Sequence, residues 1–302
     1  MRSPVKECPV VWIQGATCSG CSVSVLNTTA PEVRQLLVDQ VIPGTHLNLR
    51  FQATLMAGSG DPVIQVLADT ARQAGKFLLV VEGSVVTGGG GVFCQVGERD
   101  GRGITFLDHV LELGAKAQAV IALGTCASYG GIFAGAPNPT GCRGTAEVLA
   151  ENGISTPVVN VPGCPPHPDW FTATVLTVLL GGVPKPADLD EVGRLKSLYG
   201  KLVHENCPRR PYFDQGKFAQ HFGEEGCLYE LGCKGPQTYA DCPIRHWNSG
   251  VNWCIDAGAP CIGCCEPDFP DRFAPMYQKI TEERLERFKV VTRPAAAPAA
   301  SE

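Results

Sequence analysis

The sequence predicts an α/β fold, in which a doubly wound parallel sheet is followed by a smaller, irregular Cys-rich domain. In the first half of the chain, short apolar β-branched runs alternate with longer helical patterns, which is typical of βαβ units. These runs are continuously apolar, as expected for strands that helices cover on both faces. After residue 183 the composition changes, because Gly, Pro and Cys become frequent and few periodic segments remain.

We expect strands at the four apolar runs, which are residues 9–14, 77–82, 119–123 and 157–161. Helices are expected between and after them, over residues 24–39, 62–74, 105–113 and 169–180. A Gly-containing loop follows each strand, and three of these loops carry cysteine, at Cys18, Cys126 and Cys164. Open α/β sheets bind ligands at the carboxyl ends of their strands. The sequence therefore predicts a cysteine-lined site at that edge.

The domain organisation follows from the same change in composition. Residues 1–183 are expected to form the sheet domain, with a Gly/Pro-containing linker near its end. Residues 184–285 hold eight cysteines and too few apolar side chains to be stable by packing alone, which indicates an inorganic core. Residues 286–302 are rich in Ala and Pro and are expected to form a tail.

Composition and charge exclude several classes of protein. The 302-residue chain is 44% hydrophobic and has a formal net charge of -5, which argues against a nucleic-acid-binding protein. Only 18% of residues are charged, below the usual value of about 25%, so part of the surface is expected to be buried against a partner. The longest apolar stretch, near residues 172–183, is shorter than the roughly 20 residues of a transmembrane helix.

The fifteen cysteines are the unusual feature of the composition. The first residues do not show a charged segment followed by an apolar one, so no export signal is read there and a cytoplasmic location is expected. Disulfides are rare in the cytosol. The cysteines therefore indicate metal binding or redox chemistry.

Cys18 and Cys21 place two thiolates on one tight turn. The same spacing serves zinc sites and thioredoxin-like redox pairs, so alone it is not specific. Cys126 and Cys164 follow two other predicted strands and are expected to reach the same crevice, which gives four thiolates at one site. The alternative is a buried CxxC pair with two unrelated core cysteines.

His204 precedes Cys207 by three residues, and Cys227 and Cys233 follow at a spacing of six. Together they make a set of one imidazole and three thiolates. Imidazole in place of thiolate raises the reduction potential of an iron-sulfur cluster. Such a potential suits the last cluster of an electron-transfer chain. Taken alone, His204 would be an ordinary surface or capping histidine.

The densest group is Cys242, Cys254, Cys261 and Cys264, interleaved with tryptophan and proline. It predicts another four-cysteine site. A zinc ribbon is an alternative for this group, because a four-cysteine zinc ribbon has a similar number of cysteines. Four cysteines stay unassigned and are interpreted as small core or surface residues: Cys8, Cys94, Cys142 and Cys265.

Several motifs in combination resemble the small subunit of [NiFe] hydrogenases across nearly the whole chain. They lie at residues 11–15 (VWIQG), 124–131 (GTCASYGG), 162–168 (PGCPPHP), 261–264 (CIGC) and 266–269 (EPDF). The resemblance implies a flavodoxin-like first domain. It also implies that the group of Cys18, Cys21, Cys126 and Cys164 holds a proximal [4Fe-4S] cluster. The set that begins with His204 would hold the distal [4Fe-4S] cluster, and the last group the medial one.

Two differences from proteins that this chain resembles are informative. Most carry proline where Cys254 stands and hold a medial [3Fe-4S] cluster. The fourth thiolate here predicts a medial [4Fe-4S] cluster, as in the [NiFeSe] branch. Oxygen-tolerant relatives carry extra cysteines at the positions of Gly20 and Gly131, so an ordinary proximal cubane is expected and that tolerance mechanism is not.

The resemblance implies electron transfer with no catalytic residue in this chain. Hydrogen would be split or formed at a nickel-iron centre in an obligate large subunit, and electrons would pass through three clusters to an external acceptor near His204. The usual twin-arginine leader is not seen, which again favours the cytoplasm, or the periplasm if a leader has been removed.

Two other classes of function compete with this one. The first is an iron-sulfur subunit of another, quinone-reductase-like complex, which would resemble only the first domain. The second is a structural protein with zinc in its Cys-rich part, which would make no use of Cys126 and Cys164.

Overall fold

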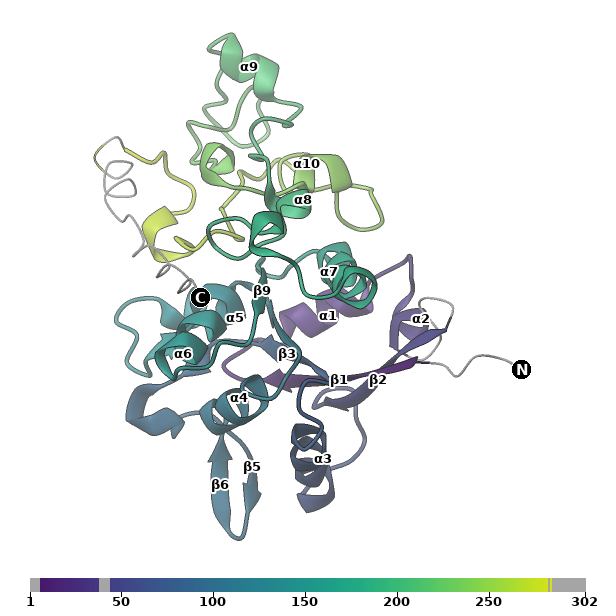
Figure 1. Cartoon of the computed structure of the whole chain (residues 1–302). Coiled ribbons are helices and arrows are strands. Elements are labelled where there is room, and N and C mark those ends of the chain that lie inside the picture. The colour runs from purple at the N-terminus through teal and green to yellow at the C-terminus, as the bar shows by residue number, and fades with distance from the viewer. Residues whose placement is uncertain (1–5, 38–43, 282, 284–302) are drawn as a thin grey trace, which may run out of the picture.

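The computed structural model describes residues 6–37, 44–281 and 283 (Figure 1). A five-stranded sheet in the order β2-β1-β3-β7-β9 forms the centre of the first domain, and every neighbouring pair in it is parallel. Its strands are β1 (Lys6–Gln14), β2 (Thr45–Gln52), β3 (Leu78–Glu82), β7 (Ala119–Leu123) and β9 (Val158–Val161). This is the flavodoxin-like doubly wound order, so the predicted fold class is confirmed.

The register of the sheet brings the strand ends to one edge. Gln14 pairs with Glu82, Glu82 with Leu123, and Leu123 with Val161. The loops that follow these four strands therefore leave the sheet side by side, as the sequence predicted.

Helices cover both faces of the sheet, and each face has its own apolar core. One face packs against α1 (Gly20–Leu26), α2 (Val33–Leu37) and α7 (Pro168–Gly181). The other packs against α3 (Asp61–Ala71), α4 (Phe106–Gly114) and α6 (Thr145–Glu151). Because successive strand residues point to opposite faces, the continuous apolar runs supply both cores at once.

Two elements differ from the sequence prediction. Strand β2 was not expected, because its alternating polar residues give no continuous apolar run. It is the edge strand among the described strands of the sheet. The helix expected over residues 24–39 is instead two helices, α1 and α2. The Asn27 side chain donates to the Val23 carbonyl where α1 ends, and Pro31 has no N–H to continue the ladder. Residues 38 and 39 lie outside the described residues.

Smaller elements surround the carboxyl edge. Helix α5 (Thr125–Tyr129) follows β7, and the short strands β4 (Val85–Val86) and β8 (Cys142–Arg143) pair antiparallel. The 3-10 turns η1 (Gly88–Gly91) and η2 (Gly131–Ala134) lie next to that pair. A hairpin of β5 (Gln95–Arg99) and β6 (Arg102–Thr105) projects from the bottom of the domain in Figure 1, away from the Cys-rich part at the top.

Between residues 184 and 281, the Cys-rich part, green to yellow in Figure 1, is built of short helices and turns. These are η3 (Pro186–Asp188), α8 (Lys196–Tyr199), α9 (Arg210–Asp214), η4 (Gly235–Gln237), α10 (Cys242–Arg245) and η5 (Asp271–Phe273). Its apolar residues share one core with α7, including Leu198, Tyr199 and Trp253. The expected tail lies outside the described residues. In the part of the chain that is described, no helix combines the length and apolarity needed to cross a membrane.

Buried Arg194 holds two segments of the Cys-rich part together, and Asn160 links one of them to the sheet domain. The Arg194 guanidinium pairs with Asp190 at 2.7 Å and with Glu266 at 2.8 Å, and it also donates to the Cys265 carbonyl at 3.1 Å. Asn160 of β9 donates to the Val192 carbonyl in the same segment at 2.7 Å. The loop that carries the last cysteines is thereby held against the carboxyl edge of the sheet.

Candidate metal centres

The structure brings Cys18, Cys21, Cys126 and Cys164 together at the carboxyl edge of the sheet. Burial raises the pKa of the Cys21 thiol, and the charges of Glu82 and of the other three thiols raise it further. Burial likewise raises the pKa of Cys164 to about 12, with Cys126 as the next cause. Since each thiolate destabilises the others, the group favours a positive centre among them. We call these four residues the proximal group.

Glycines leave room beside these thiols. A Cβ atom on Gly124 would lie 2.4 Å from the Cys21 sulfur, and φ at Gly124 is +90°. A Cβ on Gly131 would lie 2.9 Å from the Cys126 sulfur, and one on Gly20 would lie 3.1 Å from the Cys18 sulfur. The backbone therefore forms a cradle that side chains would fill, and the residues present fit a bulky inorganic group.

Glu82 at the end of β3 is a residue that sequence reasoning missed. It is fully buried and accepts hydrogen bonds from Trp12 Nε1 at 2.9 Å, from Gln14 Nε2 at 3.1 Å and from the Ser22 backbone N–H at 3.2 Å. These bonds fix the start of α1, which carries Cys21. The signal in the sequence was a carboxylate that closes an otherwise apolar strand.

Cys242, Cys254, Cys261 and Cys264 also lie close together, and we call them the medial group. Burial raises the pKa of Cys242, of Cys254 and of Cys261, and the Cys264 thiol is a further cause for each of them. Cys242 begins α10, whereas the other three come from loops. The sequence prediction that these four residues converge is thus supported by their electrostatic contact.

His204, Cys207, Cys227 and Cys233 line one small cavity, with Leu228 and Ile255 as apolar walls. We call these four residues the distal group. The His204 ring packs edge-on against Phe213 at 4.6 Å between centroids. Burial lowers the pKa of His204, and nearby Arg210 lowers it further, so the imidazole is held in the neutral form that metals bind.

The three groups form a continuous series through the molecule. The Cys264 thiol is among the charges that raise the pKa of Cys164, after burial and Cys126, which places the medial group next to the proximal one. The backbone N–H of Lys234, the residue after Cys233, donates to the Cys261 carbonyl at 2.7 Å. The medial group therefore lies between the proximal and distal groups.

Buried polar atoms supply a second test of fit. Six buried side-chain atoms have no hydrogen-bond partner among the described residues, and three of them are His204 Nε2, Asn206 Nδ2 and Trp253 Nε1. Each of these three belongs to a residue of the distal or medial group, or to a residue next to one in sequence. An unsatisfied buried donor costs ~1–3 kcal/mol, and an iron or sulfur atom of a bound cluster would remove that cost. Across the described ranges, no three His, Cys, Asp or Glu side chains are arranged to hold a single metal ion.

Two of the unassigned cysteines lie near a group. Cys142 is among the charges that raise the pKa of Cys126, after burial and Cys18, and Cys265 directly follows Cys264. Cys8 and Cys142 are buried and Cys94 is half-buried. Cys265 is buried beside Cys264, and its sulfur lies 3.5 Å from the Tyr239 carbonyl oxygen.

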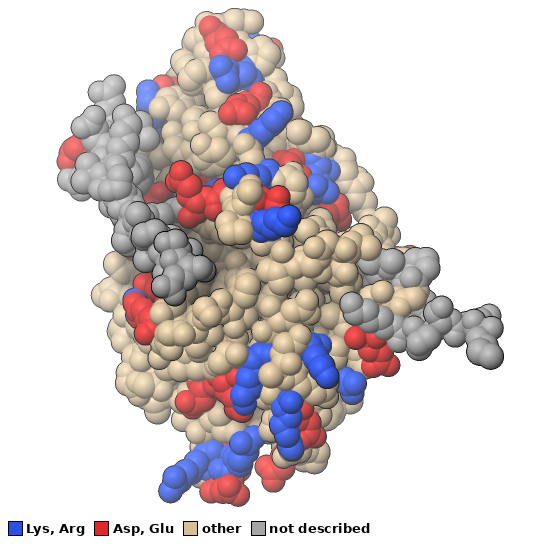
Figure 2. Space-filling model, in the orientation of Figure 1, with Lys and Arg blue, Asp and Glu red and all other residues tan. Residues whose placement is uncertain are grey.

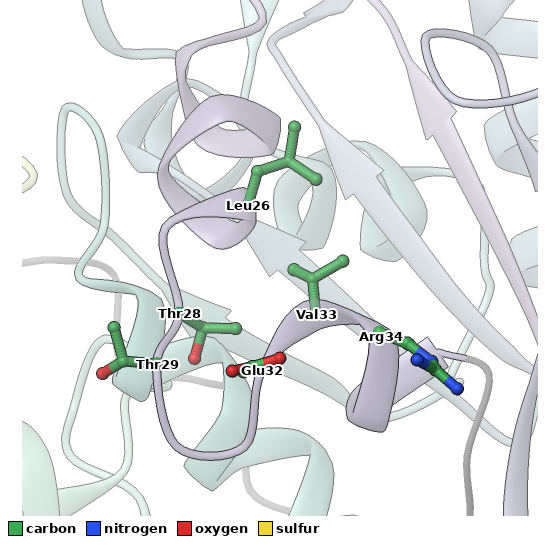
Figure 3. Close-up of a pocket in the computed structure, with 6 residues that line it drawn as sticks. All are labelled: Leu26, Thr28, Thr29, Glu32, Val33 and Arg34. Carbon is green, nitrogen blue, oxygen red and sulfur yellow. The ribbon is translucent and has the colours of Figure 1, made fainter.

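Several exposed apolar side chains lie on or next to elements at the carboxyl edge of the sheet, where the proximal group is. Cys18 is itself exposed, and α1 presents Val23 at 57% and Leu26 at 47% exposure. Phe93 follows η1, and Ile132 and Phe133 lie on η2 next to Cys126. Figure 2 shows a band with few charges between the charged upper and lower parts of the visible face. A shallow depression lies at the α1–α2 connection, lined by Leu26, Thr28, Thr29, Glu32, Val33 and Arg34 (Figure 3), and no thiol lines it.

Two family models match the chain, one in each half. The model of the NADH ubiquinone oxidoreductase 20 kDa subunit matches residues 18–178. The model of the C-terminal part of the NiFe/NiFeSe hydrogenase small subunit matches residues 199–277, where the distal and medial groups lie. A quinone-reductase-like protein was expected to resemble the first domain only, so this second match decides between the two classes.

Known proteins resemble the chain over most of its length. It is 42% identical to the periplasmic [NiFeSe] hydrogenase small subunit of Desulfomicrobium baculatum, over 92% of this chain and 89% of the relative. It is 41% identical to the periplasmic [NiFe] hydrogenase small subunit of Solidesulfovibrio fructosivorans, over 89% and 81%. The solved [NiFeSe] hydrogenase from Desulfovibrio vulgaris Hildenborough superposes with a TM-score of 0.85 at 43% identity, over 90% of this chain and 98% of that one.

These relatives correct one expectation. The cytoplasmic location was inferred from the first residues of the chain, whereas similar small subunits, including one 38% identical from Nitratidesulfovibrio vulgaris, are named as periplasmic. The cytoplasmic prediction is therefore wrong, because the residues at the start of the sequence are not evidence about export. With fold, cysteine groups and relatives in agreement, the chain belongs to the family of NiFe and NiFeSe hydrogenase small subunits, the electron-transfer partners of the nickel-iron large subunit.

Proposed function

We propose that this chain carries electrons through three [4Fe-4S] clusters, one in each cysteine group. Cys18, Cys21, Cys126 and Cys164 would hold the proximal cluster, and Cys242, Cys254, Cys261 and Cys264 the medial one. His204, Cys207, Cys227 and Cys233 would hold the distal cluster. When bound, the clusters supply one-electron redox steps. The chain's own residues hold them, exclude water from them and fix their spacing.

The observation that carries this proposal is the serial contact of the three groups. The Cys264 charge raises the pKa of Cys164, after burial and Cys126, and the backbone N–H of Lys234, which follows Cys233, donates to the Cys261 carbonyl. Thiolates that share a neighbourhood repel each other and need positive charge, which iron provides. A chain of three such groups is the arrangement that sequential electron transfer requires.

Cys254 supports a four-iron medial cluster. Cys254 is exposed at the surface, and partial burial, followed by the Cys264 charge, raises its thiol pKa, which supports a fourth thiolate beside Cys264. Four thiolates match the ligand count of a [4Fe-4S] cluster. The added negative charge would lower the reduction potential of the medial cluster and bring it closer to the potentials of the other two clusters.

The exposed apolar residues at the carboxyl edge of the sheet, where the proximal group is, support the docking of the large subunit there. Cores of obligate interfaces are richer in apolar residues than ordinary surface. Phe93 and Phe133, at 64% and 39% exposure, are aromatic anchors of the kind that such interfaces bury. The nickel-iron centre of the partner would then lie opposite Cys18.

At the other end, an external redox protein is proposed to bind near His204. Phe222 and Tyr277 are exposed there, and Arg209 donates to the Gly226 carbonyl beside Cys227 at 2.8 Å. We also propose a periplasmic location, following the names of the relatives, to be checked by cell fractionation with an antibody against the assembled enzyme.

We retain the division into a flavodoxin-like domain at residues 1–183, a cluster domain at 184–285 and a tail at 286–302. The shared core between α7 and the Cys-rich part supports two structural regions that fold together rather than independent units.

Metal analysis of the anaerobically purified heterodimer tests the proposal. Three cubanes contribute about twelve irons, so about thirteen irons and one nickel are expected with the large subunit bound. Zinc in place of iron, or iron sufficient for one cluster only, would contradict the three-cluster assignment.

A further inference from the structure

The indole N–H of Trp253 has no acceptor in the described part of the chain. The residue is 3% exposed, and its Nε1 is buried with no hydrogen-bond partner among the described residues. An indole nitrogen can only donate, and a buried donor without a partner costs ~1–3 kcal/mol. A bound group at this position would accept the bond.

The other tryptophans show that this situation is particular to Trp253. Trp12 Nε1 donates to Glu82 at 2.9 Å, and Trp170 Nε1 donates to Asp241 at 2.7 Å. The Trp247 side chain is hydrogen bonded to the Cys242 thiol. Each of these three donors has a protein partner, two of them carboxylates and one a ligand of the medial group.

The backbone places Trp253 beside the medial group from two sides. It directly precedes Cys254, and the Trp247 N–H donates to the Asn252 carbonyl at 2.6 Å, which folds the segment back on itself. The His246 ring stacks on Trp253 with an interplanar angle of 13°, and the His246 N–H donates to the Cys242 carbonyl at 3.0 Å. Trp253 thus lies on the segment that carries Cys254 and packs against His246 of the segment that carries Cys242.

We infer that Trp253 is a positioning residue of the medial cluster, whose indole N–H donates a hydrogen bond to a sulfur atom of that cluster. The inference rests on the proposed function, because it requires a cluster in the medial group. A hydrogen bond to sulfur stabilises the more negative, reduced state and raises the cluster potential. Trp253 therefore offsets part of the lowering caused by the fourth thiolate, Cys254.

Pulsed EPR on protein with 15N in the indole rings tests the inference. The heterodimer that carries Trp247→Phe is used, so that the donor already bound to Cys242 is removed, and the medial cluster is poised in its paramagnetic state. A 15N hyperfine coupling between the Trp253 indole nitrogen and that cluster is expected. Trp12 and Trp170 are not its source, because their indole N–H groups donate to the carboxylates of Glu82 and Asp241. Absence of any 15N coupling would overturn the inference.

The variant Trp253→Phe supplies the second measurement. It removes the N–H and keeps an aromatic ring, so the medial potential in an EPR redox titration should fall while the iron content stays the same. The matched control is Trp12→Phe, which removes an equally buried indole N–H from the sheet core and should leave the medial potential unchanged. A medial potential in Trp253→Phe equal to that of the wild type would contradict the inference. Absence of iron from the medial group of the wild-type enzyme would contradict the proposed function instead.

Discussion

The hydroxyl of Thr125 donates a hydrogen bond to the carbonyl oxygen of Cys264, 139 positions away in the sequence. The same hydroxyl accepts the backbone N–H of Gly163 at 2.9 Å. One side chain on α5 therefore ties the loop that carries Cys164 to the loop that carries Cys264. The contact joins the proximal and medial groups.

Replacing this hydroxyl should loosen the junction between the two groups. Thr125→Val keeps the shape of the side chain and leaves the Gly163 N–H without its acceptor, so a loss of ~1–3 kcal/mol of stability is expected. Thr125→Ser keeps the hydroxyl and serves as the control. Thermal unfolding of the heterodimer measures the difference, and equal stability of the two variants would show that the bond contributes nothing.

Replacing Cys254 tests the nuclearity of the medial cluster. Cys254→Pro removes the fourth thiolate, and a three-iron cluster with a new signal in the EPR spectrum of the oxidised enzyme is expected. Cys94→Ser changes a half-buried cysteine outside the three groups and should leave the spectrum unaltered. A Cys254→Pro spectrum identical to that of the wild type would remove Cys254 from the ligand set.

Replacing His204 separates the two ends of the relay. His204→Ala should slow electron transfer to external acceptors, since it removes a distal ligand, and should spare hydrogen-deuterium exchange at the partner's active site. His221→Ala alters an exposed histidine in the same region and is the control. Equal loss of both activities in His204→Ala would argue against a distal role.

The cradle around Cys21 depends on Gly124. Gly124→Ala would place a Cβ 2.4 Å from the Cys21 sulfur, so loss of the proximal cluster is expected along with backbone strain. Gly153→Ala isolates the strain, because φ there is also positive, at +70°, and a Cβ would meet open space. Iron content and proximal EPR signals compare the two. An intact proximal cluster in Gly124→Ala would mean that the cradle is not needed.

The buried pair of Arg194 and Glu266 should be strongly coupled. Arg194→Met leaves the Glu266 carboxylate buried without its main partner, which costs about 3–5 kcal/mol when one member of a buried pair is removed. Adding Glu266→Gln to that variant should recover much of the loss. Additive effects in the double variant, measured by chemical unfolding, would mean that the two charges do not act as a pair.

The parallel sheet and the convergence of the cysteines could be predicted from the sequence for one physical reason. Parallel strands place their carboxyl ends at one edge, so Cys126 and Cys164 had to meet the loop that carries Cys18 once β1, β7 and β9 were recognised. The order of the groups was available only by resemblance, because the Cys-rich part has no periodic pattern from which its path could be inferred.

Other features depend on tertiary context. Strand β2 is an edge strand with mixed polarity, and the break between α1 and α2 depends on local capping at Asn27. Glu82 and Arg194 are charged residues that become buried only because distant donors and acceptors reach them. No short-range sequence pattern predicts such partners. The one signal for Glu82 is that a charged residue ends an otherwise apolar strand.

A crystal of the anaerobic heterodimer measured on both sides of the iron absorption edge would test the central claim most directly. The account predicts three four-iron anomalous peaks in this chain, one within each group, with the medial peak between the other two. Fewer peaks, a zinc-edge signal in the medial or distal group, or a medial peak that does not contact Cys254 would contradict it.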